Sequence, residues 1–394
     1  MNEVPLYDLD PALWLMLTGL LVAIGPLAWV WWRSRQAPLP QRLRLLTLVT
    51  LFLTFDLVLF GAFTRLSDTG LGCPDWPGCY GNASPLGAHA EITQAQSAMP
   101  SGPVTHPKAW IEMIHRYLAT GVGVLILTLS AMTWWAHRQA RQTPPANPQR
   151  AALNPWWPTF TLLWVCLQGA FGALTVTMKL FPLIVTLHLL GGLILLALLR
   201  AQSQRFARAA GELSVVGVPP RTWLLLLASF GLLWLQLALG GWVSTNYAVL
   251  ACTEFPGCQG SLWPAMDWQQ GFTLWRALGA GREGSYISFE ALTAIHYAHR
   301  LAAYVVLAAL LLLARELNKV PALRSLALWV LALALWQLAT GLSNVLFGWP
   351  LLAAVSHTGG AAGLVVVLTG ALFKCRPATG LPHGSKSKAS RLSS

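Results

Sequence analysis

Long apolar runs separated by short polar segments form the main pattern along this chain of 394 residues. A helix needs about 20 apolar residues to cross the roughly 30 Å hydrocarbon core of a bilayer. Nine runs approach or exceed that length, and they cover residues 12–32, 44–63, 111–135, 158–178, 183–200, 222–244, 291–314, 323–345 and 350–373. They lack the alternation of a membrane barrel strand, so the pattern predicts an all-α, membrane-embedded fold.

Basic residues gather in every second connection between these runs. They are Arg33, Arg35, Arg42 and Arg44; Arg138, Arg141 and Arg150; Arg200, Arg205, Arg208 and Arg221; Arg315, Lys319 and Arg324; and Lys374, Arg376, Lys386, Lys388 and Arg391. The positive-inside rule places these connections in the cytoplasm, and the N-terminus and the loops 64–110 and 245–290 in the periplasm. The bacterial inner membrane is the expected location, with the C-terminus cytoplasmic. Topology accounts for the net charge of +12 and leaves no need for a nucleic-acid partner.

The same order of features occurs twice along the chain. In the first half an apolar run leads to C-P-D-W-P-G-C at 73–79 and then to a helix that contains His115 and Arg116. In the second half an apolar run leads to C-T-E-F-P-G-C at 252–258 and then to His299 and Arg300. The sequence therefore contains an internal repeat of about four helices.

A later part of the chain supports the repeat, because Gln168 precedes His188 by the same interval as Gln337 precedes His357. We divide the chain as follows: an extra N-terminal helix with its basic connection at 1–43, a first four-helix bundle at 44–200, a cytoplasmic linker at 201–221, a second bundle at 222–373 and a basic disordered tail at 374–394. Both bundles start on the cytoplasmic side, so the repeat is parallel.

Five of the nine histidines lie inside apolar runs, where an ionisable side chain is costly and marks a functional site or a paired interior position. They are His115, His188, His296, His299 and His357. The alternative is a histidine that only hydrogen-bonds across helices, but four duplicated positions favour a function. We interpret the other four, His89, His106, His137 and His383, as ordinary polar loop residues.

Neutral imidazole is a common metal ligand, and two facing helices can each offer one to a heme iron. Zinc would need further ligands that the spans lack. We therefore expect His115 with His188, and His299 with His357, to ligate two heme irons. All four lie early in helices that begin outside, within roughly 10 Å of the outer boundary. Two hemes at one depth suit oxidation chemistry on one heme better than electron transfer across the membrane.

Glu112 occupies the place that His296 has in the second half, three positions before the expected ligand. One interpretation is an ion pair with Arg116 at i+4. The other is a carboxylate that acts as a base or an electrostatic stabiliser beside a reacting group. The asymmetry predicts one reactive heme site and one spectator.

Each long outer loop holds a pair of cysteines, and a periplasmic location permits disulfides. We predict that Cys73 bonds to Cys79 and Cys252 to Cys258, which would brace the loops or allow exchange with a redox partner. A metal site made of all four cysteines is the alternative.

These motifs resemble the heme A synthase family of bacteria and mitochondria. The residues that carry the resemblance extend over nearly the whole chain after about residue 44, and they are Thr64-Arg65-Leu66, Gly70-Leu71, Asp75-Trp76, Glu112 to Arg116, Gln168-Gly169 with Gly172, His188, His299-Arg300 and His357. The resemblance implies a core of two four-helix bundles. It also implies that the first bundle takes heme O as substrate between His115 and His188, and that the second holds heme b as cofactor between His299 and His357.

The implied activity is that of an oxidoreductase that converts the C8 methyl group of heme O to a formyl group, giving heme A for cytochrome oxidase. The partners we expect are heme O with the farnesyl transferase that delivers it, the lipid bilayer and an electron partner that the sequence does not identify. The sequence leaves open whether the chain also forms a homo-oligomer. We expect Arg116 and Arg300 to pair with heme propionates, and His296 to lie near a propionate without binding iron. The alternative function is a bis-histidine membrane cytochrome b that carries electrons to or from quinol and does not need Glu112.

Overall fold

The computed structural model describes residues 10–142, 153–281 and 284–378. Within these ranges nine helices are long and apolar enough to span a membrane, which confirms the predicted fold class. They are α1 (Asp10–Ser34), α2 (Leu39–Leu66), α4 (His106–Gln142), α6 (Trp156–Thr177), α7 (Pro182–Ala209), α8 (Pro220–Thr245), α10 (Phe289–Asn318), α11 (Arg324–Leu346) and α12 (Leu351–Lys374). Each predicted run lies on one of these helices and exceeds it by at most one residue.

The connections contain shorter elements that hydropathy does not mark. They are α3 (His89–Ala98), η1 (Ala248–Ala251), α9 (Trp268–Gly271), η2 (Pro321–Leu323), β1 (Val216–Val218) and β2 (Cys375–Pro377). The two strands pair in parallel, with Val216 opposite Cys375. His89 begins α3 and His106 begins α4, and their rings lie 4.6 Å apart between centroids.

The structure differs from the sequence division at the cytoplasmic linker and the tail. Helix α7 continues to Ala209 because side chains beyond the apolar run, such as Gln202 and Phe206, are buried against neighbouring helices. The first residues after α12, assigned to the disordered tail, form β2 instead. The remainder of the predicted tail, 379–394, lies outside the described residues.

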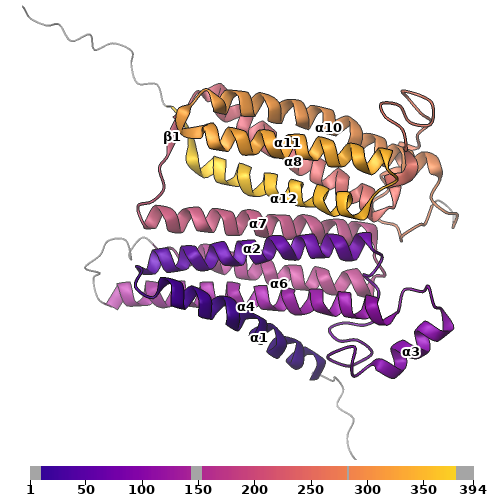
Figure 1. The fold of residues 1–394 in the computed structure, drawn as a ribbon, viewed down its shortest axis with the longest axis horizontal. Coiled ribbons are helices and arrows are strands. Elements are labelled where there is room, and N and C mark those ends of the chain that lie inside the picture. The colour runs from indigo at the N-terminus through magenta and orange to yellow at the C-terminus, as the bar shows by residue number, and fades with distance from the viewer. Residues whose placement is uncertain (1–9, 143–152, 282–283, 379–394) are drawn as a thin grey trace, which may run out of the picture.

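The long helices lie side by side, with the disulfide loops at one end and the β1–β2 pair at the other (Figure 1). In the first repeat α2 and α6 each pack against both α4 and α7. In the second repeat α8 and α11 each pack against both α10 and α12. Helices α7 and α12 join the two repeats, because each of them packs against the other and against a second helix of the opposite repeat.

Helix α1 lies outside this arrangement and packs mainly on α4. A β-carbon built at Gly19 would lie 2.4 Å from the side chain of Thr120, and one at Gly121 would lie 2.8 Å from Val22. The two helices therefore approach closely at small residues, as membrane helices commonly do.

Many large apolar side chains on the outer faces of the helices are exposed, including Trp14, Leu21 and Trp31 on α1. Lipid tails would cover such a surface, because they are as apolar as the side chains themselves. One buried cluster extends through both repeats, from Leu51 and Leu196 to Leu310 and Leu368. The two repeats thus share a continuous apolar core.

Candidate active site

Four of the five intramembrane histidines lie on four different helices: His115 on α4, His188 on α7, His299 on α10 and His357 on α12. All four side chains are half-buried. His115 is near enough to His188 to interact with it electrostatically, and His299 is similarly near His357. The structure thus brings the four side chains together as one pair in each repeat.

A glycine on the preceding long helix faces the first histidine of each pair. A β-carbon built at Gly61 of α2 would lie 3.0 Å from Nε2 of His115, and one at Gly240 of α8 would lie 3.0 Å from Cε1 of His299. Comfortable contacts between carbon atoms are about 3.5–4.0 Å. A side chain at either glycine would therefore press on the imidazole.

The second histidine of each pair faces a glycine in the same way. A β-carbon built at Gly172 of α6 would lie 3.4 Å from Cε1 of His188, and one at Gly341 of α11 would lie 3.4 Å from Cε1 of His357. The internal repeat is therefore reproduced in the surroundings of the histidines as well as in the order of motifs.

Polar groups next to the rings set their orientation. Nδ1 of His357 lies 2.8 Å from the hydroxyl of Thr340. The amide nitrogen of Gln236 lies 3.0 Å from Nδ1 of His299 and donates to the backbone carbonyl of the same residue at 3.1 Å. Nδ1 of His188 is buried and has no hydrogen-bond partner.

This donor set fits a heme better than a small metal ion. A buried imidazole nitrogen without a partner costs free energy. For His188 this cost would disappear if one ring nitrogen bound a heme iron and the other formed a hydrogen bond. Within 10–142, 153–281 and 284–378 no group of three or more histidine, cysteine or acidic side chains could hold a metal ion. Two imidazoles per repeat, each facing a glycine, match the ligand pair of a six-coordinate heme.

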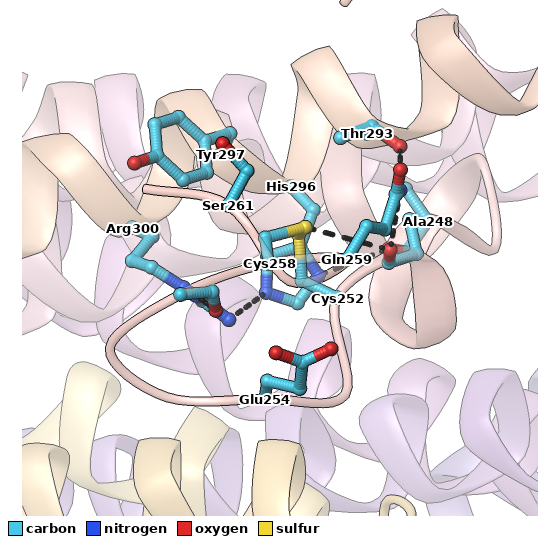
Figure 2. Close-up of a disulfide and its surroundings, with 12 residues drawn as sticks. Ala248, Cys252, Glu254, Cys258, Gln259, Ser261, Thr293, His296, Tyr297 and Arg300 are labelled. Atoms are coloured by element: carbon cyan, nitrogen blue, oxygen red, sulfur yellow. Dashed lines mark hydrogen bonds between the residues drawn. A yellow bond between two sulfur atoms is a disulfide. The ribbon is translucent and has the colours of Figure 1, made fainter. Parts of the chain in front are cut away.

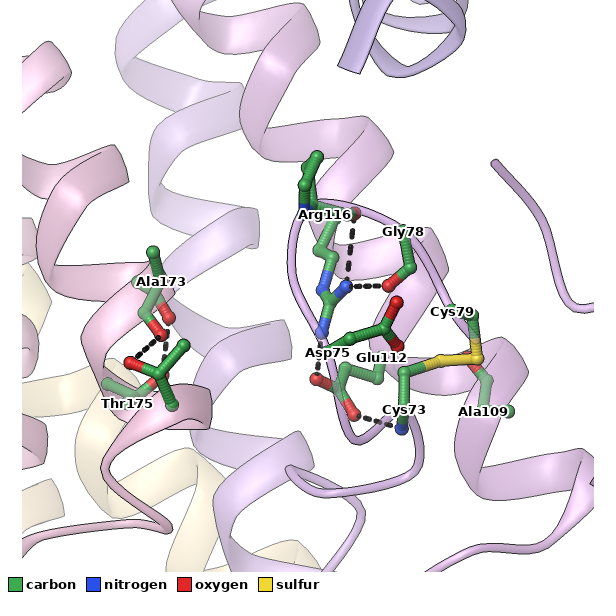
Figure 3. Close-up of polar contacts among 12 residues, drawn as sticks. Cys73, Asp75, Gly78, Cys79, Ala109, Glu112, Arg116, Ala173 and Thr175 are labelled. Carbon is green, nitrogen blue, oxygen red and sulfur yellow. Dashed lines mark hydrogen bonds and ion pairs between the residues drawn. A yellow bond between two sulfur atoms is a disulfide. The ribbon is translucent and has the colours of Figure 1, made fainter. Parts of the chain in front are cut away.

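The first disulfide, between Cys73 and Cys79, closes the loop above α4, as predicted (Figure 3). Arg116 donates from Nη1 to the carbonyls of Pro77, at 3.1 Å, and of Gly78. Asp75 accepts hydrogen bonds from the backbone of the turn that follows the second cysteine. Charged side chains thus hold the second half of the loop and the turn that follows it.

The second disulfide, between Cys252 and Cys258, closes an equivalent loop beside α10 (Figure 2). Arg300 donates from Nη1 to the carbonyls of Pro256 at 3.3 Å and Gly257 at 2.7 Å. Glu254 accepts from the backbone of the following turn, as Asp75 does in the first loop. Both disulfide predictions are confirmed, and the four sulfur atoms are not available for the alternative metal site.

Glu112 is fixed between its own helix and the first loop (Figure 3). One carboxylate oxygen forms an ion pair with Nη2 of Arg116 at 2.5 Å, and the other accepts from the backbone N–H of Cys73 at 3.0 Å. The side chain is 6% exposed. The ion pair considered from the sequence is therefore present, and it is part of a contact that ties α4 to the loop.

His296 occupies the equivalent position on α10, and both of its ring nitrogens are used (Figure 2). Nδ1 lies 3.0 Å from the carbonyl of Ala248, so Nδ1 carries the proton and donates it. Nε2 then accepts from Nη2 of Arg300 at 3.5 Å. His296 is therefore engaged in holding the second loop, which distinguishes it from His299.

The arginines were expected to pair with heme propionates, and in the structure their guanidinium groups bind the disulfide loops. Arg116 and Arg300 each use Nη1 for two loop carbonyls and Nη2 for the side chain one turn earlier. A guanidinium has five N–H donors, so these contacts leave donors for an additional carboxylate. Arg116 and Arg300 could then bind a disulfide loop and the propionate of a bound heme at the same time.

Sequence reasoning overlooked Gln236, Thr340 and Gly341 as neighbours of the histidines. A glutamine or threonine in an apolar span is a weak signal, and its contact with a histidine on another helix depends on packing. The two glutamines that the sequence did single out connect neighbouring helices. Nε2 of Gln337 donates to the carbonyl of His357 at 2.8 Å, and Gln168 packs closely against Gly191 of α7.

Known proteins share this organisation in sequence. The sequence profile of the cytochrome oxidase assembly protein family matches residues 44–369. A protein of Shewanella oneidensis named heme A synthase is 41% identical over 325 residues, which are 81% of this chain and 92% of that protein. A heme A synthase of Symbiobacterium thermophilum is 29% identical over 341 residues, covering 84% of this chain and 94% of that protein. The profile begins within α2, so α1 precedes the matched region.

Proposed function

Because the chain belongs to the heme A synthase family of cytochrome oxidase assembly proteins, we propose that it oxidises the C8 methyl group of heme O to a formyl group. In this proposal His115 and His188 hold heme O as substrate, and His299 and His357 hold heme b as cofactor. The observation that carries it is the duplicated pair of half-buried histidines, each facing a glycine. Bound heme would supply the redox chemistry, and the residues of this chain supply the ligands and the position.

The asymmetry between the repeats indicates which pair is reactive. Glu112 places a carboxylate one turn before His115, where the second repeat has the neutral ring of His296. Both carboxylate oxygens already accept hydrogen bonds. We therefore propose that Glu112, held in place by these contacts, acts at the heme O site by electrostatic stabilisation.

We propose a bacterial inner-membrane location with the histidine pairs near the periplasmic face. The positive-inside rule supports this orientation, because the disulfide loops lie at the helix ends opposite the basic connections. Disulfides also suit an oxidising compartment. Heme O would then come from its farnesyl transferase within the same membrane, and the electron partner would approach from a surface still to be identified.

The test is extraction and chromatography of hemes from membranes of a host that makes heme O, with and without this protein. Heme A should appear with the wild-type chain and disappear with His115→Ala, whereas His89→Ala, an exposed histidine of α3, should leave it unchanged. If the wild-type protein retains only heme b and heme O stays unaltered in air with native partners present, the cytochrome b alternative replaces this proposal.

A further inference from the structure

Arg200 lies near the inner end of α7 and packs against α12. A β-carbon built at Gly370 would lie 2.6 Å from Nη2 and 2.9 Å from Nε of Arg200, so the guanidinium contacts the α12 backbone directly. The carboxamide of Gln204, one turn later, lies beside the guanidinium; with its amide turned so that the oxygen faces Arg200, that oxygen accepts from Nη1 at 2.8 Å and from Nη2 at 2.9 Å. Nε is buried without a partner, and none of the ion pairs among the described residues involves Arg200.

A second guanidinium lies close to the first. Arg44, at the inner end of α2, is near enough to Arg200 for the two like charges to interact. Arg44 forms an ion pair with Glu212, and its Nε is also buried without a partner. The one ion pair here belongs to Arg44, so Arg200 has no counter-charge among the described residues, and a partly buried cation without a counter-charge is costly.

Arg200 lies at a depth close to the inner boundary of the hydrocarbon core, next to the lipid headgroups. Arg200 follows the start of α7 at Pro182 by eighteen residues, a rise of about 27 Å along the helix. That distance nearly crosses the hydrocarbon core of about 30 Å. The guanidinium groups thus reach the inner boundary of the membrane.

The neighbouring arginines of α7 differ from Arg200. Arg205 stacks on Trp157, with its guanidinium carbon 4.3 Å from the ring centroid, and Arg208 is exposed. The positive-inside rule is enough to explain the presence of these two arginines. Arg200 is half-buried between helices of both repeats, so topology alone does not explain it.

We propose that Arg44 and Arg200, with Gln204, form a binding site for a phosphate group between α2, α7 and α12 at the cytoplasmic end. Guanidinium groups bind phosphate oxygens through paired, charge-assisted hydrogen bonds, and basic pockets between membrane helices on the cytoplasmic side bind anionic headgroups. The phosphate comes either from the headgroup of an anionic lipid or from free inorganic phosphate. The site is independent of the heme chemistry proposed above.

The test measures thermal unfolding of the purified full-length protein in phosphatidylcholine nanodiscs. Phosphatidylglycerol is added in one series, and inorganic phosphate against chloride at equal ionic strength in another. Saturable stabilisation by phosphatidylglycerol alone identifies a lipid headgroup, and stabilisation by phosphate identifies the free anion. Arg200→Gln should weaken the apparent affinity about tenfold or more, and Arg208→Gln, which removes the same charge from the same helix, by less than about twofold.

Two further variants keep the test decisive if Arg200→Gln does not fold. Arg44→Gln changes a partly exposed side chain and should weaken binding by a similar factor. Glu212→Gln removes the carboxylate that competes for Arg44 and should tighten binding severalfold. The proposal is overturned if neither ligand stabilises the wild type beyond its control, or if Arg200→Gln and Arg208→Gln weaken binding equally.

Discussion

Replacement of Gly240 by alanine should expel heme from the second histidine pair. The new β-carbon would lie 3.0 Å from Cε1 and 3.5 Å from Nδ1 of His299. Because a relaxed carbon contact is about 3.5–4.0 Å, the ring must move by about 0.5–1 Å. That shift also disturbs the 3.0 Å contact between Nδ1 and Gln236.

The expected loss of heme affinity can be judged from other metal-binding histidines. Loss of the groups that orient a metal-bound histidine typically weakens metal binding by about tenfold to hundredfold. We expect Gly240→Ala to lower the affinity for heme b by this factor. Gly231→Ala on the same helix, where nothing lies within 4 Å of the new carbon, is the matched control and should bind heme as the wild type does.

The assay is optical titration of the purified, heme-depleted protein with heme b, which does not depend on catalytic activity. Unchanged heme affinity in Gly240→Ala would refute the placement of heme against His299. An equal loss in Gly231→Ala would show that alanine disturbs α8 in general.

Four other changes test separate parts of the structure. Glu112→Gln should keep heme bound and abolish heme A formation in the extraction assay, whereas Glu91→Gln in the exposed part of α3 should have no effect; retained heme A would remove the catalytic role of Glu112. Cys73→Ser opens the first loop and should lower stability to denaturant by about 2 kcal/mol; unchanged stability would show that the disulfide contributes nothing beyond the contacts of Arg116. His296→Ala should loosen the second loop, seen as faster amide hydrogen exchange there, while heme b stays bound; loss of heme would make it a ligand. Burial raises the pKa of Tyr247 above its ordinary value, so the unfolded chain ionises first and stability should fall as pH rises above about 10; Tyr247→Phe should remove this alkaline loss.

Hydropathy predicted the spanning helices closely because a membrane imposes one length and one composition on each of them. The apolar run stops before α7 does, because Gln202, Ser203 and Gln204 are polar yet buried by packing near the C-terminal end of the helix. The same limit applies to β1 and β2, since strands of three residues carry almost no signal of their own.

The repeat predicted the histidine pairs because duplication places equivalent residues in equivalent surroundings. It could not show that Arg116 and Arg300 hold the disulfide loops, because the acceptors are backbone carbonyls, which any sequence provides. Nor could it single out Gln236, whose partner lies 63 residues away on another helix. Such contacts arise only when the helices have packed.

The parallel pairing of β1 with β2 has a consequence for the synthesis of the protein. Val216 is made about 160 residues before Cys375, its partner in the pair. The ribosome therefore releases the connection between the repeats long before the segment that completes it, and all four helices of the second repeat must enter the membrane in between. A chain truncated just before Cys375 would keep every spanning helix and both histidine pairs, yet it would lack the strand pair that links the end of α12 to the connection between the repeats.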